Sequence, residues 1–132
     1  MKSLEEIRNI FSGDIYATDT TGIVIEEARP GYCRVSLKID RRHGNAAGRV
    51  MGAVYFTMAD FAFAVANNAE LTEPVAVTLS SQINFLSGAR GGTLYAEAKA
   101  VRSGRHTGFY DITVTDDLGT LIATVSSVSY RG

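Results

Sequence analysis

One carboxylate stands alone in a long apolar stretch of the sequence. Asp60 is the only charged residue between Arg49 and Glu70, and its neighbours are mostly alanine, phenylalanine, valine and methionine. A carboxylate among apolar side chains loses solvation, so it needs polar partners or its pKa rises. A carboxylate of raised basicity can act as a general base or attack as a nucleophile. Asp60 is therefore the first candidate for a catalytic residue.

A structural role for Asp60 is the alternative. Its carboxylate could accept a hydrogen bond from Thr57, one helical turn earlier, or face solvent through a gap. Asn67 lies seven positions after Asp60, which returns it to nearly the same face of a helix. It either lines the same cleft or is a solvated amide near the helix end. The residues alone leave both alternatives open.

The element that carries Asp60 is predicted to be a buried helix over residues 52–68. The stretch is rich in alanine, has no internal glycine or proline, and is apolar on nearly every side. This pattern is typical of a helix surrounded by protein. The stretch is too short for a membrane span and has a carboxylate at its middle, so we expect a core helix and no membrane association.

The rest of the chain is predicted to form a short N-terminal helix and six strands. Ser3 and Glu6 resemble a capping box, and Gly13 can end the helix that follows. Alternating apolar residues and turn signals predict the strands, which cover residues 23–28, 33–39, 75–85, 93–102, 107–115 and 120–130. Short connections favour an antiparallel meander for the last four. We expect one α+β domain over residues 1–132, with one antiparallel sheet covering the long helix.

Composition excludes several classes of function. The 13 basic and 14 acidic residues give a net charge of -1 with no basic run, so we expect no nucleic-acid binding. Cys33 is the only cysteine, and the N-terminus lacks the apolar core of a signal peptide, so we expect a cytoplasmic protein. His43 and His106 are the only histidines, and neither metal-ligand spacing nor a nucleotide-binding glycine loop is present. We expect no metal and no cofactor.

Several blocks of the sequence resemble the phenylacetate-type hotdog thioesterases. That family's signature is Asn, a short loop, His-Gly-Gly, a few apolar residues and Leu-Ala-Asp. The stretch over residues 43–60, HGNAAGRVMGAVYFTMAD, resembles it, and so do the blocks over residues 61–68, 81–88 and 103–112. Their order and spacing match from about residue 20 to the end of the chain, which is more specific than the short motif alone.

The resemblance implies a hotdog fold, in which a sheet wraps one long helix, and subunits that pair edge to edge as dimers or tetramers. It implies hydrolysis of acyl-CoA thioesters to acid and CoA at the dimer interface. By position in the motif, Asp60 matches the catalytic carboxylate, Gly52 the backbone donor to the thioester carbonyl, and Asn45 the side chain that positions the nucleophile or water.

Further residues of the resembling blocks are candidates for substrate contact. Asn84 and Phe85 lie within the block over residues 81–88, and Arg105 and His106 lie in a turn that could bind the phosphates or pantetheine of CoA. The alternative for this turn is ordinary solvated residues.

The spacing of Gly52 and Asp60 gives a separate reason to expect an oligomer. Eight residues in one helix separate the two groups by about 12 Å along the axis. A reacting carbonyl must lie within roughly 3 Å of both. Two antiparallel helices from two subunits can meet this requirement, with each Asp60 serving the other subunit's Gly52.

The sequence departs from the family signature at two positions. Met51 and Ala53 stand where the family has histidine and the second glycine. Met51 could line an acyl pocket, and the essential donor is a backbone N–H, so hydrolysis of an aryl or medium-length acyl group remains our first prediction. The departures motivate an alternative, a non-catalytic acyl-CoA-binding protein. A hotdog dehydratase ranks third, because no histidine lies on the long helix or immediately before it.

Overall fold

The computed structural model describes all residues 1–132 and places two short helical segments before the sheet. Helix α1 (Leu4–Phe11) begins at a complete capping box, in which the Ser3 hydroxyl accepts from the Glu6 N–H and the Glu6 carboxylate accepts from the Ser3 N–H. This confirms the predicted N-terminal helix. A π-helical turn, η1 (Tyr16–Thr21), follows and was not predicted.

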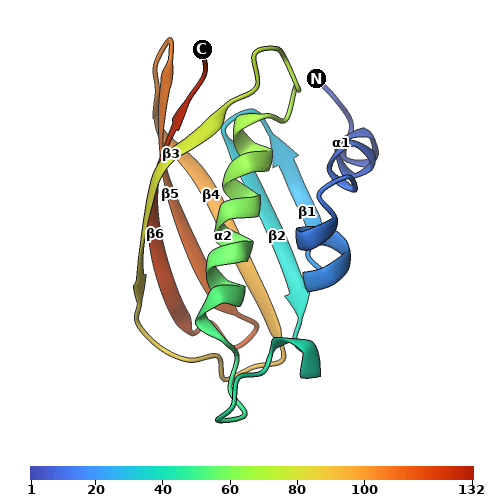
Figure 1. Ribbon diagram of the computed structural model, residues 1–132, viewed down its shortest axis with the longest axis vertical. Coiled ribbons are helices and arrows are strands. Elements are labelled where there is room, and N and C mark those ends of the chain that lie inside the picture. Colours follow the sequence, from blue (N-terminus) through green and yellow to red (C-terminus); the bar gives the residue numbers. More distant parts are fainter.

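Six antiparallel strands form one sheet in the spatial order β1-β2-β4-β5-β6-β3 (Figure 1). Their bounds lie within two residues of the predicted ones: β1 (Val24–Arg29), β2 (Tyr32–Lys38), β3 (Val77–Phe85), β4 (Thr93–Ser103), β5 (Thr107–Asp116) and β6 (Leu121–Tyr130). Between β2 and α2, the polar loop contains a short 3-10 turn, η2 (Arg41–His43). The α+β class and the six-stranded sheet are confirmed.

The predicted meander of the last four strands is wrong for β3. Strands β4, β5 and β6 do follow one another, but β3 pairs with β6 at the far edge of the sheet. The loop over residues 86–92 carries the chain back across the end of the sheet. Its first N–H groups bond to the Ile122 carbonyl of β6, and those of Arg90 and Gly91 bond to the Asp116 carboxylate at the end of β5. These bonds hold the loop in place on its path from β3, at the edge of the sheet, past β6 and β5 to β4.

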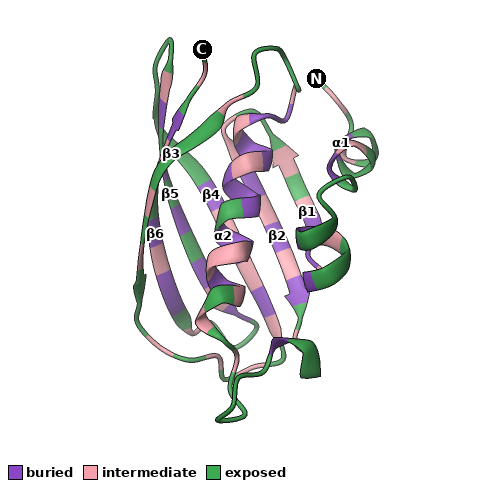
Figure 2. Ribbon diagram, viewed as in Figure 1, coloured by how far each residue is buried: buried purple, intermediate pink, exposed green.

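Helix α2 (Gly52–Asn67) crosses the sheet and packs mainly against β2, β4 and β5. One side of the helix, which includes Met58, Ala62 and Val65, is completely buried against the strands. The opposite side is open, because Ala53 and Asp60 are exposed and Ala64 is half-buried. Figure 2 shows this change around the helix. Within one chain, α2 is therefore not enclosed on all sides as its apolar sequence predicted.

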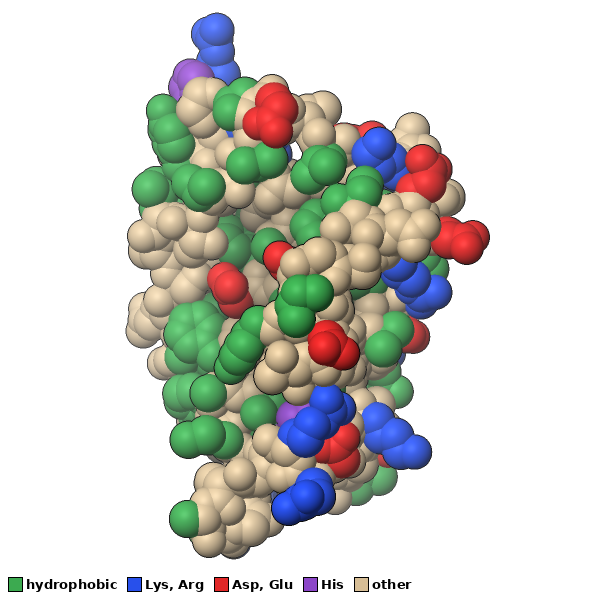
Figure 3. Space-filling view, turned by 45° about the vertical axis from the view of Figure 1, so that its right-hand side comes forward, with side chains coloured by type: hydrophobic (Ala, Val, Ile, Leu, Met, Phe, Trp, Pro, Cys, Tyr) green, Lys and Arg blue, Asp and Glu red, His purple; other side chains and the backbone are tan.

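Strand β3 is exposed on both faces for most of its length. It pairs only with β6, so its other edge presents unpaired backbone groups. Val77, Leu79 and Phe85 are exposed apolar side chains on this strand. Figure 3 shows hydrophobic side chains gathered along the left-hand margin of the molecule. An edge strand of this length and apolarity is a surface on which another strand can add.

Candidate active site

The carboxylate of Asp60 has no hydrogen-bond partner and no ion-pair partner in the chain. The bond from Thr57 that a structural role of Asp60 could have used is not formed, because the Thr57 hydroxyl donates to the Ala53 carbonyl at 2.8 Å. Asp60 projects from the middle of α2, on the side that the sheet leaves open. A structural polar network therefore does not account for this carboxylate.

Asp60 lies between two hollows that flank the open side of α2. The first, which we call the β3 hollow, has a volume of about 560 Å³. Its lining joins one face of α2 to the start of β3, namely Ala53, Phe56, Thr57, Asp60, Thr78, Leu79, Ser80 and Ser81. Apart from Asp60, its polar groups are hydroxyls, and no cation lines it. The carboxylate thus borders a space large enough for part of a substrate.

The second space, the η1 hollow, lies on the other flank of Asp60 and has a volume of about 330 Å³. It is bounded by α2 and by the segment from Gly13 to Ala17, and Asp14, Ile15, Tyr16, Phe61 and Ala64 are among its lining residues. A smaller hollow of about 160 Å³ adjoins it, since Tyr16 and Thr57 line both. Met51 and Ala53 line this smaller hollow. The two positions that depart from the family signature therefore lie next to the space around Asp60.

The surroundings of Asp60 raise its pKa above the usual value for an aspartate. The main cause is partial burial against the neighbouring side chains, and the negative charge of Asp14 adds to it. Both effects disfavour the charged form of the carboxylate. The side chain nevertheless remains open to the hollows, so it combines raised basicity with access to substrate or water.

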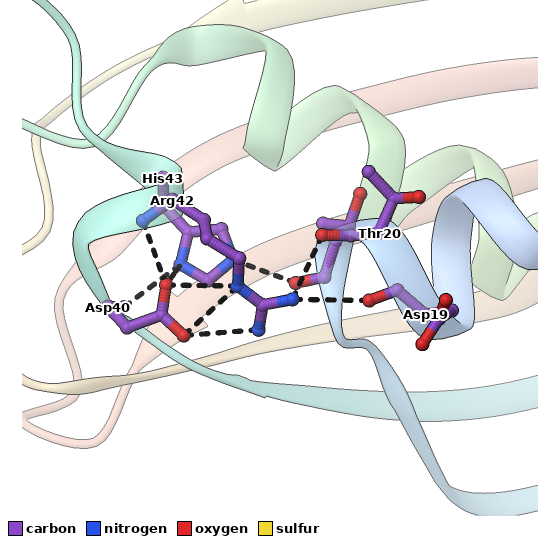
Figure 4. A network of polar contacts seen from close by, with 6 residues as sticks. Asp19, Thr20, Asp40, Arg42 and His43 are labelled. Atoms are coloured by element: carbon purple, nitrogen blue, oxygen red, sulfur yellow. Dashed lines mark hydrogen bonds and ion pairs between the residues drawn. The ribbon is translucent and has the colours of Figure 1, made fainter.

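A polar latch holds η1 against the loop that precedes α2 (Figure 4). The Arg42 guanidinium donates to the carbonyls of Asp19 and Thr20 at 3.1 and 3.0 Å, and it forms an ion pair with Asp40. His43, only 2% exposed, accepts the Asp40 N–H at Nδ1, so its Nε2 carries a proton and donates to the Thr21 carbonyl at 2.7 Å. The latch holds residues 19–21, which directly follow the segment that lines the η1 hollow, against the loop before α2.

Gly52 is the first residue of α2, and its N–H has no acceptor in the chain. The preceding residue, Met51, gives no side-chain cap. The N–H is therefore available to an external anion, and the helix dipole favours negative charge at this end. The ring of Phe85 lies against Gly52, because a Cβ added at Gly52 would stand 3.1 Å from the nearest ring carbon. The structure thus brings Gly52 and Phe85 together from distant parts of the sequence.

Gly52 and Asp60 do not meet within one chain. Both belong to the single helix α2, so the eight-residue spacing places them about 12 Å apart along its axis. Asn45 is also apart from Asp60, in the exposed loop before α2. Its side-chain oxygen accepts the N–H groups of Ala47 and Arg49, so its amide nitrogen remains free to donate.

Asn67 does not line either hollow at Asp60, so the interpretation of one shared cleft is wrong. Its amide donates to the Phe63 carbonyl and accepts from the Ser129 hydroxyl. It borders a separate hollow of about 370 Å³ between the end of α2 and the β4–β5 hairpin, together with Arg105 and His106. Asn84 is an exposed residue of β3 without a side-chain hydrogen bond and lines none of these spaces.

Sequence comparison places this arrangement in a known family. The model of the thioesterase superfamily matches residues 47–123, which is more than half of the chain and includes α2 and the strands β3 to β5. The chain belongs to the thioesterase superfamily. Its class of activity is that of a thioester hydrolase.

Two proteins of related sequence and two solved structures are informative. A putative esterase of Archaeoglobus fulgidus is 35% identical over 108 residues, which cover 81% of this chain and 69% of the relative. The acyl-coenzyme A thioesterase PaaI of Escherichia coli is 32% identical over 111 residues, covering 83% and 78%. The solved structure of the E. coli PaaI protein from the phenylacetic acid degradation operon superposes with a TM-score of 0.82, 27% identity and coverage of 98% and 96%.

The second solved structure contains a ligand. The protein smu.793 of Streptococcus mutans, bound to acetyl CoA, superposes with a TM-score of 0.76 and 27% identity, over 83% of this chain and 88% of that one. These structures confirm the hotdog fold predicted from the sequence blocks.

Sequence reasoning missed the residues that build the η1 hollow. Asp14 and Tyr16 lie in a segment without regular periodicity, and the π-helical turn has no sequence pattern of its own. One signal was available in the sequence, namely the glycine at position 22. It ends this turn with a φ of 89°, in the left-handed region that favours glycine.

Proposed function

We propose that this protein hydrolyses acyl-CoA thioesters to a free acid and CoA at a site shared by two copies of the chain. The observation that carries the proposal is the unpartnered carboxylate of Asp60, which has a raised pKa and borders two hollows on the open side of α2. The names of the relatives support acyl-CoA as the substrate class.

The chemistry requires an attacking oxygen and donors for the oxyanion. Asp60 either removes a proton from a water molecule that attacks the thioester carbonyl, or attacks the carbonyl itself to form an anhydride that water then cleaves. The free N–H of Gly52 supplies a donor at a helix N-terminus, where negative charge on the carbonyl oxygen is stabilised. In both routes the CoA thiolate leaves and takes up a proton.

Two copies are needed because Gly52 and Asp60 of one helix are about 12 Å apart. We propose that the copies pair through their β3 strands, so that the open sides of their α2 helices run antiparallel and each Asp60 faces the other copy's Gly52. The unpaired edge of β3 and its exposed apolar residues, Val77 and Leu79, support this arrangement. The arrangement would also cover the open side of α2, which explains an apolar sequence that one chain leaves uncovered.

Placement of the CoA moiety follows from charge. The hollow at the β4–β5 hairpin begins at Asn67, about 10 Å along the axis from Asp60. Arg105, His106 and Arg131 line it, and they give it the cationic and donor groups that suit phosphate. We propose that this hairpin binds the phosphates of CoA, from either copy of the pair. Met51, Ala53 and Val54 then give the acyl part of the site apolar contacts for an aryl or medium-length chain, beside the polar side chains of the same hollow.

The first test measures release of free thiol from a panel of acyl-CoAs, including phenylacetyl-CoA, by wild type and Asp60→Asn. We expect loss of about 10²- to 10⁴-fold in kcat/KM, the range for removal of a general base. The substitution breaks no hydrogen bond, so the variant should melt at or above the temperature of the wild type. Asp111→Asn, an exposed acid on β5, serves as the matched control. A folded wild type that binds acyl-CoA without turnover would favour the alternative, a non-catalytic binding protein.

The second test addresses the shared site. Val77→Lys places a cation on the apolar β3 edge, and we expect it to yield monomers with little thiol release in sedimentation and activity assays. Val101→Lys is the control, because Val101 is similarly exposed but lies on β4 in the middle of the sheet. A Val77→Lys monomer with full activity would contradict the shared site.

A further inference from the structure

A second carboxylate faces the space around Asp60 and has no assigned role. Asp14 lines the η1 hollow together with Asp60, and no lysine, arginine or histidine lines that hollow. The Asp14 side chain forms no ion pair and accepts no hydrogen bond. The hollow therefore contains two carboxylates without an ion-pair partner, beside the side chains of Ile15, Tyr16 and Phe61.

The position of Asp14 is fixed by the backbone. Its N–H bonds to the Phe11 carbonyl, and its own carbonyl accepts both the N–H and the hydroxyl of Thr18, each at 2.9 Å. The segment that follows is held by the latch from Arg42 and His43. Its charge also reaches the catalytic candidate, since Asp14 is one of the two causes of the raised pKa of Asp60. Asp14 is thus an exposed acid whose backbone position is held by these hydrogen bonds.

The charges also orient the substrate. The phosphates of CoA would be repelled by two carboxylates, whereas the apolar side chains of the η1 hollow suit an uncharged acyl group. The β3 hollow on the other flank contains only one carboxylate, Asp60, along with the hydroxyls of Thr78 and Ser80. These charges favour an acyl group in the η1 hollow and the CoA arm on the β3 side.

We propose that Asp14 is a specificity-determining residue that makes the site select uncharged acyl groups and reject acyl groups ending in a carboxylate. The inference rests on the proposed thioesterase function and deepens it, because it names the charge class of the acyl group. A carboxylate terminus in the η1 hollow would meet Asp14 in addition to Asp60, and the one lysine or arginine of the adjoining hollow, Arg42, is already paired with Asp40. Removal of the Asp14 charge should change the ratio of kcat/KM between carboxylate-ended and uncharged acyl groups roughly three- to tenfold, at the effective dielectric of a partly open site.

The test compares succinyl-CoA with butyryl-CoA, which share a four-carbon acyl chain and differ by the terminal carboxylate. We expect wild type to prefer butyryl-CoA. Asp14→Asn should raise the ratio of kcat/KM for succinyl-CoA over butyryl-CoA about three- to tenfold, and Asp14→Lys should raise it further. Asp19→Asn is the control, because its side chain is exposed and lines no hollow. Added salt should weaken the discrimination in wild type.

Binding measurements separate this inference from the proposed function. The same two ligands are titrated by calorimetry into each variant, and their ratio of Kd is compared with the kinetic ratio. Turnover of butyryl-CoA with a ratio that stays within twofold in both Asp14 variants would overturn the inference and leave the proposed function standing. Absence of turnover in every protein would overturn the proposed function, and the ratio of Kd would then decide the role of Asp14.

Discussion

The carboxylate of Asp116 should be a main determinant of stability, although it is remote from Asp60. Its side chain is only 3% exposed and accepts four backbone N–H groups, from Arg90, Gly91, Leu118 and Thr120, at 2.8–3.0 Å. These bonds tie the crossover loop to the β5–β6 turn and so hold β3 at the far edge of the sheet. Burial alone would raise the pKa of Asp116, but the N–H groups outweigh it and hold the pKa well below its usual range.

Asp116→Asn preserves the shape of the side chain but replaces one acceptor oxygen with an NH₂ donor. Two of the four N–H groups then lose their acceptor and face another donor. A hydrogen bond to a charged group contributes about 1.5–3 kcal/mol. We therefore expect the free energy of unfolding at pH 7 to fall by about 3–6 kcal/mol, a large part of the stability of a domain this size.

The pH dependence gives the sign of the electrostatic contribution. A carboxylate whose pKa is lowered by folding contributes stability above its unfolded pKa of about 3.9 and loses it as the pH falls towards the folded pKa. The difference between wild type and Asp116→Asn should therefore be largest above pH 5 and shrink steadily below pH 4. Urea denaturation followed by circular dichroism over this range measures it.

The neighbouring acid supplies the control. Asp117 is exposed and accepts the N–H groups of Gly92 and Thr93 at 3.0 and 3.3 Å. Asp117→Asn should lower the free energy of unfolding by at most about 1 kcal/mol, since solvent can replace these bonds. A loss below 1 kcal/mol in Asp116→Asn, or a loss independent of pH, would refute the reasoning.

Two further expectations concern the active site and its wall. Because the pKa of Asp60 is raised, kcat/KM for thiol release should rise with pH through a midpoint above 3.8. Asp14→Asn should shift this midpoint to lower pH, because it removes a nearby negative charge. A midpoint unchanged by Asp14→Asn would contradict the electrostatic effect of Asp14 on Asp60. Gly22→Ala should lower the free energy of unfolding by about 1–3 kcal/mol in urea denaturation, because the residue has a φ of 89° and the new methyl would stand 2.7 Å from Arg42 Nη2. Gly48→Ala, with a φ of 76° and no neighbour within 4 Å, isolates the backbone strain and should cost less.

The sequence by itself determined the local elements and the leading catalytic candidate. Hydrophobic periodicity depends on neighbours along the chain, so it located α2 and all six strands within two residues. The capping box of α1 is equally local. Asp60 stood out because a charged residue in an apolar helix is unfavourable without a polar partner. The structure shows no hydrogen-bond or ion-pair partner for it in the chain.

The tertiary structure decided which residues share a space. Asn67 has the same helical phase as Asp60, yet packing against Ser129 of β6 places it in another hollow. Strand β3 lies beside β6 because the loop over residues 86–92 is anchored by Asp116, more than twenty residues away in sequence. Asp14 and Asp60 line one hollow because the segment before η1 lies beside α2, and bonds from Arg42 hold the following turn in place. These placements depend on long-range contacts, which leave no period or spacing in the sequence, whereas the chemistry of each side chain can be read from its type.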